Sequence, residues 1–202
     1  ITIYLDPPIV PQGHSLFVSI TVNEPTSFLT ATLGGQVLTL ARGDGGQWAV
    51  VGYDPDAAVG DVVMSAAVAD LVGNTGQVTA TVVVTRFVFP IEHVRGEVIE
   101  IPPDRAELLN PDITASEAKR LTAVFAGVSP EPLWSGLFTV PVSGTQSSPL
   151  AIRRSYDGGP LTSWHGGVDI AVDSGVPVAV SNRGRLVLSE ALKVRGNAVI
   201  VD

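Results

Sequence analysis

Apolar and polar residues alternate in short segments along the first 86 residues of the chain. In residues 16–22, for example, Ser19 and Thr21 alternate with branched apolar residues, which is the period of a β-strand with one buried face. Seven segments of this kind predict strands: residues 1–5, 16–22, 28–33, 37–41, 48–53, 62–69 and 78–85. Glycine, proline, asparagine and aspartate separate them, as expected for turns.

About seven short strands with turn signals every 8–12 residues or so are typical of an immunoglobulin-like β-sandwich. We therefore predict such a sandwich for residues 1–86, with Trp48 in its core. No site chemistry emerges from this part. His14 is expected in an exposed loop, and Asp44, Asp54, Asp56 and Asp61 have two readings, a calcium site or polar turn residues, of which the second is favoured.

Residues 87–132 change character and are predicted to form a connector. A hairpin is expected over residues 91–101, turning at Arg95-Gly96, and His93 within it is assigned a structural role. One helix follows, with a capping box at Thr114 and Glu117 and an apolar stripe. The stripe consists of Ala118, Leu121, Val124 and Phe125, and Gly127 and Pro130 are expected to end the helix.

The composition narrows the function classes. The 202 residues include no cysteine, which removes disulfide frameworks and thiolate metal sites. The net charge of −8 argues against non-specific nucleic-acid binding. No apolar run reaches the roughly 18–20 residues that a membrane helix needs, and no signal peptide is visible. Because the chain begins and ends in strand-like runs, we expect a piece of a longer protein.

Residues 133–202 are again rich in short apolar runs and glycine, with strands expected at residues 138–142, 168–172, 176–180, 185–188 and 198–201. Within them lies Trp164-His165-Gly166-Gly167-Val168-Asp169-Ile170-Ala171. A histidine and an aspartate four residues apart share a face if they lie on one strand. One imidazole and one carboxylate are two of the three protein ligands that a catalytic zinc site needs.

The motif and its surroundings resemble the first half of the lysostaphin/LytM-type zinc metallopeptidase domain, which has a duplicated hybrid motif and cuts peptide cross-links in peptidoglycan. The shared features include Arg153-Arg154, Asp157-Gly-Gly-Pro160, the histidine–aspartate segment, and Gly196-Asn-Ala-Val-Ile-Val-Asp202. The chain departs from the family at Leu150-Ala151, where the family usually has an aromatic residue and glycine.

The resemblance implies that His165 and Asp169 are zinc ligands, with one Zn²⁺ per complete domain. The third ligand, a histidine, and the catalytic histidines are expected after Asp202, so no catalytic residue is expected within these residues. Trp164, Gly166, Gly167, Arg153 and Arg154 are candidates for the substrate groove. Trp164 could equally serve packing, and the arginines are favoured as structural partners of aspartates on neighbouring strands.

The resulting prediction is a mainly β, extracytoplasmic zinc endopeptidase acting on peptidoglycan peptides, with weak metal affinity and no activity over residues 1–202 alone. An unpaired strand edge at residues 199–201 could pair with a separate fragment that completes the domain. The alternative is a non-catalytic protein on the same scaffold that binds the wall or activates a hydrolase. A third class, an adhesin-like module, leaves the likeness of residues 133–202 unexplained.

Overall fold

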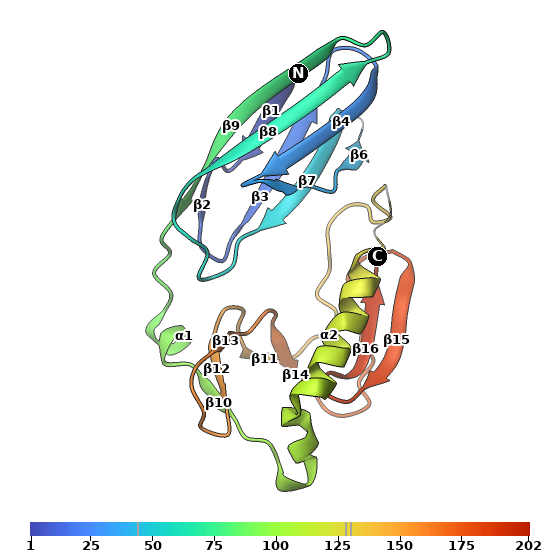
Figure 1. The fold of residues 1–202 in the computed structure, drawn as a ribbon. Coiled ribbons are helices and arrows are strands. Elements are labelled where there is room, and N and C mark those ends of the chain that lie inside the picture. Colours follow the sequence, from blue (N-terminus) through green and yellow to red (C-terminus); the bar gives the residue numbers. More distant parts are fainter. Residues whose placement is uncertain (44, 128, 130) are drawn as a thin grey trace. The chain divides into compact units, whose positions relative to one another are not determined.

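The computed structural model describes residues 1–43, 45–127, 129 and 131–202. It is mainly β, with several antiparallel sheets and few helices, as predicted (Figure 1). The chain divides into two compact units, residues 1–88 and 89–202. The predicted connector therefore belongs, from residue 89 onward, to the same unit as the histidine–aspartate motif.

The first unit contains two sheets. One has the order β1 (Thr2–Asp6), β3 (Ser15–Thr21), β7 (Gly46–Gly52) and β6 (Ala41–Gly43). The other has the order β2 (Ile9–Pro11), β9 (Thr75–Thr85), β8 (Gly60–Asp70), β4 (Thr26–Leu33) and β5 (Gln36–Val37). Each of the seven predicted segments overlaps a strand, although residues 37–41 meet β5 and β6 only at their two ends. Strand β2 is a short strand that the pattern did not predict.

The core of the first unit takes side chains from both sheets. On β3 the alternation is strict, and Leu16, Val18 and Ile20 are at most 1% exposed. Met64 of β8 and Val82 of β9 are fully buried in the same cluster. Burial of these five side chains removes apolar surface from water. This removal is the main favourable contribution to the free energy of folding.

Trp48 is not a core residue, so that prediction was wrong. It lies opposite Ser19 in the pairing of β3 with β7, on the same face as Phe17, and the two rings stack 5.8 Å apart. Trp48 is half-buried, whereas its neighbour Ala49 is 7% exposed and faces inward. Residues 48–51 are apolar on both faces, and the alternation therefore does not reveal which face is buried.

The second unit begins with helix α1 (Ile91–Arg95), strand β10 (Glu97–Ile99), the 3₁₀ segment η1 (Pro103–Leu109) and helix α2 (Pro111–Phe125). Six short strands follow: β11 (Thr145–Ser148), β12 (Arg153–Tyr156), β13 (Ser163–Trp164), β14 (Asp169–Ala171), β15 (Leu186–Leu192) and β16 (Gly196–Val201). They form three small sheets, β10-β12-β13, β11-β14 and β15-β16.

The hairpin predicted over residues 91–101 is replaced by α1 and β10. Strand β10 pairs in parallel with β12, so that Glu97 lies beside Arg154. Gly96 makes the change of direction with a φ of 74°, a conformation that favours glycine. The pattern suggested a local partner, whereas the real partner is 57 residues further along the chain.

The N-cap of helix α2 lies four residues before Thr114, the predicted N-cap. Asn110 is its N-cap and accepts a hydrogen bond from the Asp112 amide at 2.9 Å, and Pro111 occupies the first helical position. Thr114 donates to the carbonyl oxygen of Asn110 at 3.3 Å instead of capping. The helix ends at Phe125, before Gly127, while Pro130 lies outside the described residues.

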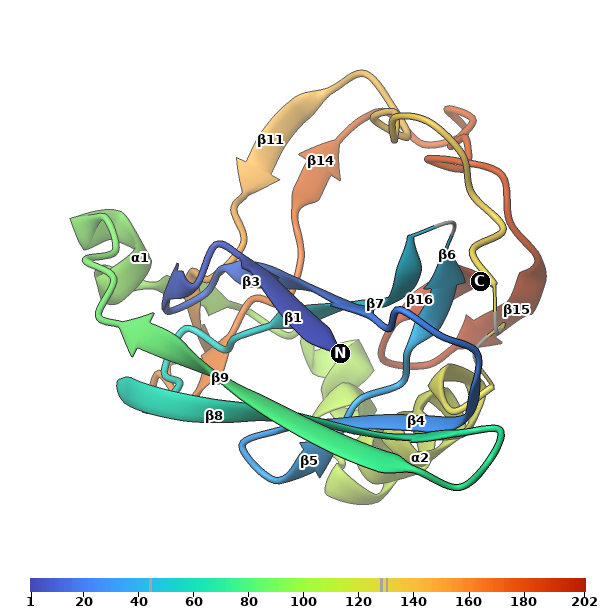
Figure 2. The same ribbon diagram turned by 90° about the horizontal axis from the view of Figure 1, so that it is seen from above.

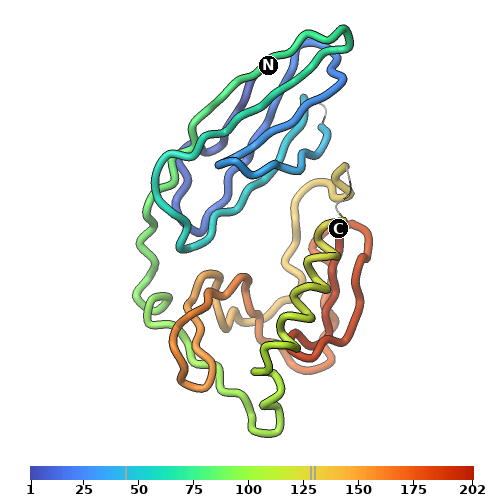
Figure 3. Tube along the Cα trace, in the orientation of Figure 1, coloured from blue at the N-terminus to red at the C-terminus, as the bar shows by residue number. Residues whose placement is uncertain are grey.

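Glu117 of α2 is only 8% exposed and contacts the turn between β15 and β16, which lie beside the helix in Figures 1 and 3. Its carboxylate accepts hydrogen bonds from the amides of Lys193 at 2.6 Å and Val194 at 3.0 Å, and from Arg195 at 3.0 Å. The capping role predicted for Glu117 was therefore wrong. Of the predicted apolar stripe, Leu121 and Val124 are half-buried and Ala118 and Phe125 are exposed.

Three of the five strands predicted in residues 133–202 are present, as β14, β15 and β16. Residues 138–142 and 176–180 are not strands. They do contact each other, since Thr139 donates to the carbonyl of Ser181 at 2.8 Å and Ala179 donates to that of Pro141 at 2.9 Å. Proline 141 has no amide to continue a ladder, which limits this pairing to isolated hydrogen bonds.

Candidate metal centre

His165 and Asp169 are brought together by two different sheets. His165 directly follows β13, and its backbone exchanges 2.8 Å hydrogen bonds with the Ala151 amide and the Ile152 carbonyl. Asp169 begins β14, which pairs with β11 and lies beside it in Figures 1 and 2. Ser148, at the end of β11, is the register partner of Asp169.

The two candidate ligands face each other at 3.2 Å, measured from His165 Nε2 to Asp169 Oδ1. The expected reason was wrong, because residues 165–168 are not a strand and the pair does not share one strand face. The His165 side chain is 10% exposed and that of Asp169 is 50% exposed. The imidazole is therefore largely buried, while the carboxylate is half exposed to solvent.

The other imidazole nitrogen, Nδ1, lies 2.9 Å from the carbonyl oxygen of Pro149 and 3.2 Å from Ser148 Oγ. A carbonyl oxygen can only accept, so the proton is on Nδ1. In neutral His165 the Nε2 lone pair then points at a carboxylate oxygen. Two acceptors at this distance repel each other unless a proton or a metal cation lies between them.

This arrangement fits two ligands of a tetrahedral zinc ion. Bonds of about 2.1 Å at tetrahedral angles place two ligand atoms about 3.4 Å apart. A metal-binding histidine usually donates its other N–H to a carbonyl or carboxylate, as His165 does. No third histidine, cysteine or acidic residue in the described part of the chain completes a group that could hold a metal.

The two predicted arginines have separate surroundings. Arg154 bonds Asp169 Oδ2 through Nη2 at 2.6 Å and Glu97 through Nε. Desolvation lowers the pKa of Arg154, but the hydrogen bonds to Glu97 and Asp169 outweigh it and raise that pKa above its ordinary value. Arg153 instead stacks on Trp164 with its guanidinium carbon 4.5 Å from the ring centroid.

The remaining predicted groove residues differ in access. The Trp164 ring contacts both Arg153 and Phe89, whose ring centroid is 5.5 Å away, and is therefore engaged in packing. Gly166 is exposed, and a Cβ there would meet no atom within 4 Å. A Cβ on Gly167 would lie 3.9 Å from His165 Nε2, so this glycine leaves open the side of the imidazole that carries the lone pair.

Glu97 and Ser148 are members of this cluster that sequence reasoning missed. Ser148 Oγ donates to Glu97 Oε1 at 2.9 Å and lies 3.1 Å from Arg154 Nη2. Neither residue has a local spacing that signals the site. Glu97 is distant in sequence, and Ser148 is one of several serines in a polar run.

Of the residues that the structure describes, the other histidines and the aspartates of the first unit do not contribute to the candidate metal centre. His14 is exposed in a loop, with its ring 4.8 Å from that of Phe87, and His93 of α1 lies against Phe89. Asp54, Asp56 and Asp61 form no metal-binding group among the described residues, and Asp44 lies outside them. No helix in the described part of the chain is long and apolar enough to cross a membrane.

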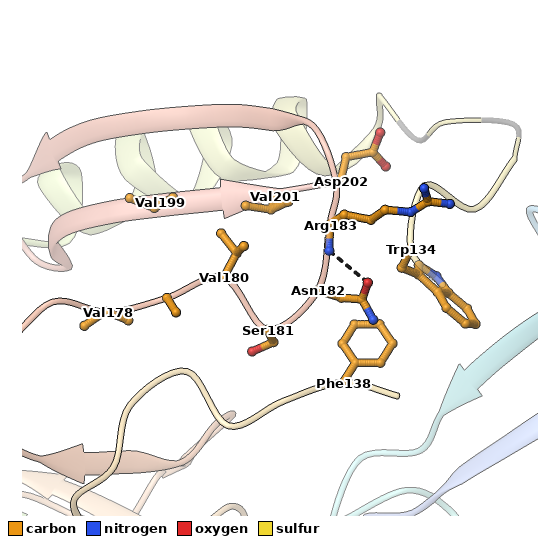
Figure 4. A pocket seen from close by; sticks show the side chains of 11 residues that line it. Trp134, Phe138, Val178, Val180, Ser181, Asn182, Arg183, Val199, Val201 and Asp202 are labelled. Atoms are coloured by element: carbon orange, nitrogen blue, oxygen red, sulfur yellow. Dashed lines mark hydrogen bonds between the residues drawn. The ribbon is translucent and has the colours of Figure 1, made fainter. Parts of the chain in front are cut away.

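A cavity of about 410 Å³ lies elsewhere in the second unit (Figure 4). It is mainly apolar, with Val178 and Val180 on one side and Val199 and Val201 of β16 on the other, while Trp134 and Phe138 lie at its edge. Its polar end holds Asn182, whose Oδ1 accepts a 2.8 Å hydrogen bond from the Arg183 amide. None of the predicted site residues lines this cavity.

No known protein-family profile matches the chain, and no curated protein matches it. Among solved structures, a polysaccharide lyase matches with 17% sequence identity and a TM-score of 0.36. The match covers 46% of this chain and 13% of the lyase chain. A likeness of this degree carries no argument about fold or activity.

Proposed function

We propose that the second unit contains the N-terminal part of a zinc metallopeptidase domain of the lysostaphin/LytM type. The single observation that carries the proposal is the 3.2 Å approach of His165 Nε2 and Asp169 Oδ1 within a His-Gly-Gly-Val-Asp motif. The proposed substrate is the peptide part of peptidoglycan, and the proposed location is therefore extracytoplasmic. On this reading the first unit is an immunoglobulin-like β-sandwich that spaces the peptidase domain or binds the wall.

His165 would hold the metal through Nε2 and Asp169 through Oδ1. A bound zinc ion would supply Lewis acidity that activates water for attack on a peptide carbonyl. The chain's own residues set the geometry around it. The carbonyl of Pro149 keeps the proton of His165 on Nδ1, and Gly167, where an added Cβ would lie 3.9 Å from Nε2, keeps a side chain away from that nitrogen.

Two ligands hold zinc weakly, because the third would supply a further bond to the metal and fix the tetrahedral geometry. For the 202-residue polypeptide we therefore expect weak zinc binding and no peptide hydrolysis. The function is tested with the polypeptide at its full encoded length. Incubation with purified peptidoglycan should release free amino groups, a chelator should stop the release, and Zn²⁺ should restore it.

His165→Ala should abolish this release, and His14→Ala, in an exposed loop of the other unit, is the matched control. Hydrolysis that survives His165→Ala would reject the proposal. If the wild-type protein sediments with peptidoglycan but releases no amino groups, the second candidate stands, a non-catalytic wall-binding or hydrolase-activating protein. The observation in favour of that candidate is the absence of a third ligand among the described residues.

A further inference from the structure

Arg154 is the centre of the hydrogen bonds around the candidate ligands. Its Nε bonds Glu97, and its Nη2 lies 3.1 Å from Ser148 Oγ and 2.6 Å from Asp169 Oδ2. The side chain is 17% exposed. Three of the five N–H donors of the guanidinium are engaged by these partners, which points to a role within the protein.

The contact of Arg154 with Asp169 decides which carboxylate oxygen faces the imidazole. Arg154 takes Oδ2, and Oδ1 is left facing His165 Nε2 at 3.2 Å. The Asp169 side chain is 50% exposed, and without this contact solvent would leave its rotation free. Arg154 meets Asp169 through the one Nη2–Oδ2 hydrogen bond and Glu97 through Nε, so the rigid guanidinium ties the Asp169 carboxylate to Glu97, which a single lysine ammonium does not.

The same cluster also orients the histidine. Ser148 Oγ uses its only proton to bond Glu97 at 2.9 Å. Its lone pairs are then available to accept from Arg154 Nη2 and from His165 Nδ1, which lies 3.2 Å away. Glu97 therefore supports both candidate ligands, one through Arg154 and the other through Ser148.

We propose that Glu97 and Arg154 are positioning residues that orient Asp169 and His165 for the metal. This inference rests on the proposed zinc site, and it names the residues that hold the two ligands in place. It places one necessary residue, Glu97, on β10, well before the segment that resembles the peptidase domain. Partners of metal ligands typically contribute 10- to 100-fold to metal affinity.

The alternative role for Arg154, competition with the metal, predicts the opposite change in zinc affinity. A guanidinium next to a dication repels it, so an Arg154 that merely neutralised Asp169 would compete with zinc. Its removal would then tighten binding. The change in zinc affinity on removing Arg154 therefore separates positioning from competition.

The experiment titrates Zn²⁺ alone into the 202-residue polypeptide and follows the imidazole ¹⁵N signals of His165 by NMR. Arg154→Met and Glu97→Gln should each weaken binding about 10-fold or more. In the metal-free variants the ¹⁵N shifts of His165 should remain those of the Nδ1-protonated form, because the carbonyl of Pro149 stays in place. Arg154→Lys should bind with intermediate affinity. Arg153→Met is the matched control and should bind as the wild type does, because Arg153 contacts Trp164 and Leu161 instead of a ligand.

Unchanged or tighter zinc binding in Arg154→Met, with the wild type binding through His165, would overturn the inference and leave the zinc site intact. Wild-type binding that is unaffected by His165→Ala would instead reject the zinc site and the inference with it. If Arg154→Met unfolds the second unit, seen as loss of the β15–β16 amide signals, Glu97→Gln gives the decision. That variant keeps the size and one acceptor of the side chain, and it replaces the charge and the second oxygen by an NH₂ group.

Discussion

The amide of Ala151 donates a 2.8 Å hydrogen bond to the carbonyl oxygen of His165. Ala151 makes this contact with a φ of 64°, in the left-handed region, and is 4% exposed. For an alanine this conformation costs about 1–2 kcal/mol. The backbone that orients the candidate ligand therefore carries local strain at the position where the resembled family has glycine.

We expect Ala151→Gly to be neutral or to stabilise the second unit by up to about 1 kcal/mol, because relief of strain offsets the lost methyl group and the added chain entropy. Ala66→Gly, at a buried strand position of the first unit, should instead cost about 1–2 kcal/mol. Urea unfolding of each unit measures both changes. A loss in Ala151→Gly as large as that in Ala66→Gly would contradict the strain.

Gly96→Ala should destabilise the second unit by more than about 2 kcal/mol. A Cβ at Gly96 would lie 2.7 Å from the carbonyl oxygen of Arg153, and φ is 74°. Gly158→Ala is the control, since Gly158 has a φ of 71° but no atom within 4 Å of the added Cβ, and it should show the strain alone. Equal losses in the two variants would mean that β10 and β12 are not held at this close approach.

Glu117→Gln should lower the thermal stability of the second unit clearly more than Glu190→Gln. Glu117 accepts two amide hydrogen bonds and one from Arg195, and removal of its charge weakens all three. Glu190 pairs with Arg120 where both side chains are well exposed, and such surface pairs contribute little. Calorimetry of the two variants provides the comparison. Equal melting temperatures would mean that the Glu117 contacts contribute no more stability than an exposed ion pair.

The second unit should lose stability in acid. Desolvation raises the pKa of Glu117, but its hydrogen bonds from Val194, Arg195 and Lys193 win and hold that pKa below its usual value. Ser129 likewise lowers the pKa of Asp202. A depressed folded-state pKa gives stability that is present above the unfolded value, 4.5 for Glu117, and is lost as the pH falls through the folded value.

Urea unfolding of the second unit at pH 7, 5, 4 and 3 measures this dependence. In Glu117→Gln the decline below pH 4.5 should be smaller, because the variant has no proton to take up at this position. A decline that is as steep in the variant as in the wild type would assign the acid sensitivity to other groups.

The local patterns predicted the strands of the first unit because residues such as Val18 and Ile20 alternate with polar neighbours. Trp48 was misplaced because its strand is apolar on both faces, and only pairing with β3 decides which face is buried. The start of α2 was missed although Asn110-Pro111 is a normal cap and first-turn pair. Glu117 had the spacing of a capping box, yet a turn 76 residues away provides better donors.

The motif at His165 and Asp169 was visible in the sequence, but its supports were not. Glu97 meets Arg154 through parallel pairing of β10 with β12. A strand of three residues is too short to show a periodic pattern of apolar residues, so the sequence does not predict this pairing. Ser148 meets Asp169 through a bulged register between β11 and β14. Tertiary contacts of this kind can be placed only when the sheets are known.

The pairing of β10 with β12 also bears on the order of folding. It closes a loop of 57 residues, and chain entropy makes such a closure slower and more costly than the formation of the β15–β16 hairpin. The ligand pair would therefore gain its supports late, after local elements such as α2 have formed. Until that closure His165 and Asp169 would lack these contacts, so a metal ion at the proposed site would stabilise the finished unit without directing its formation.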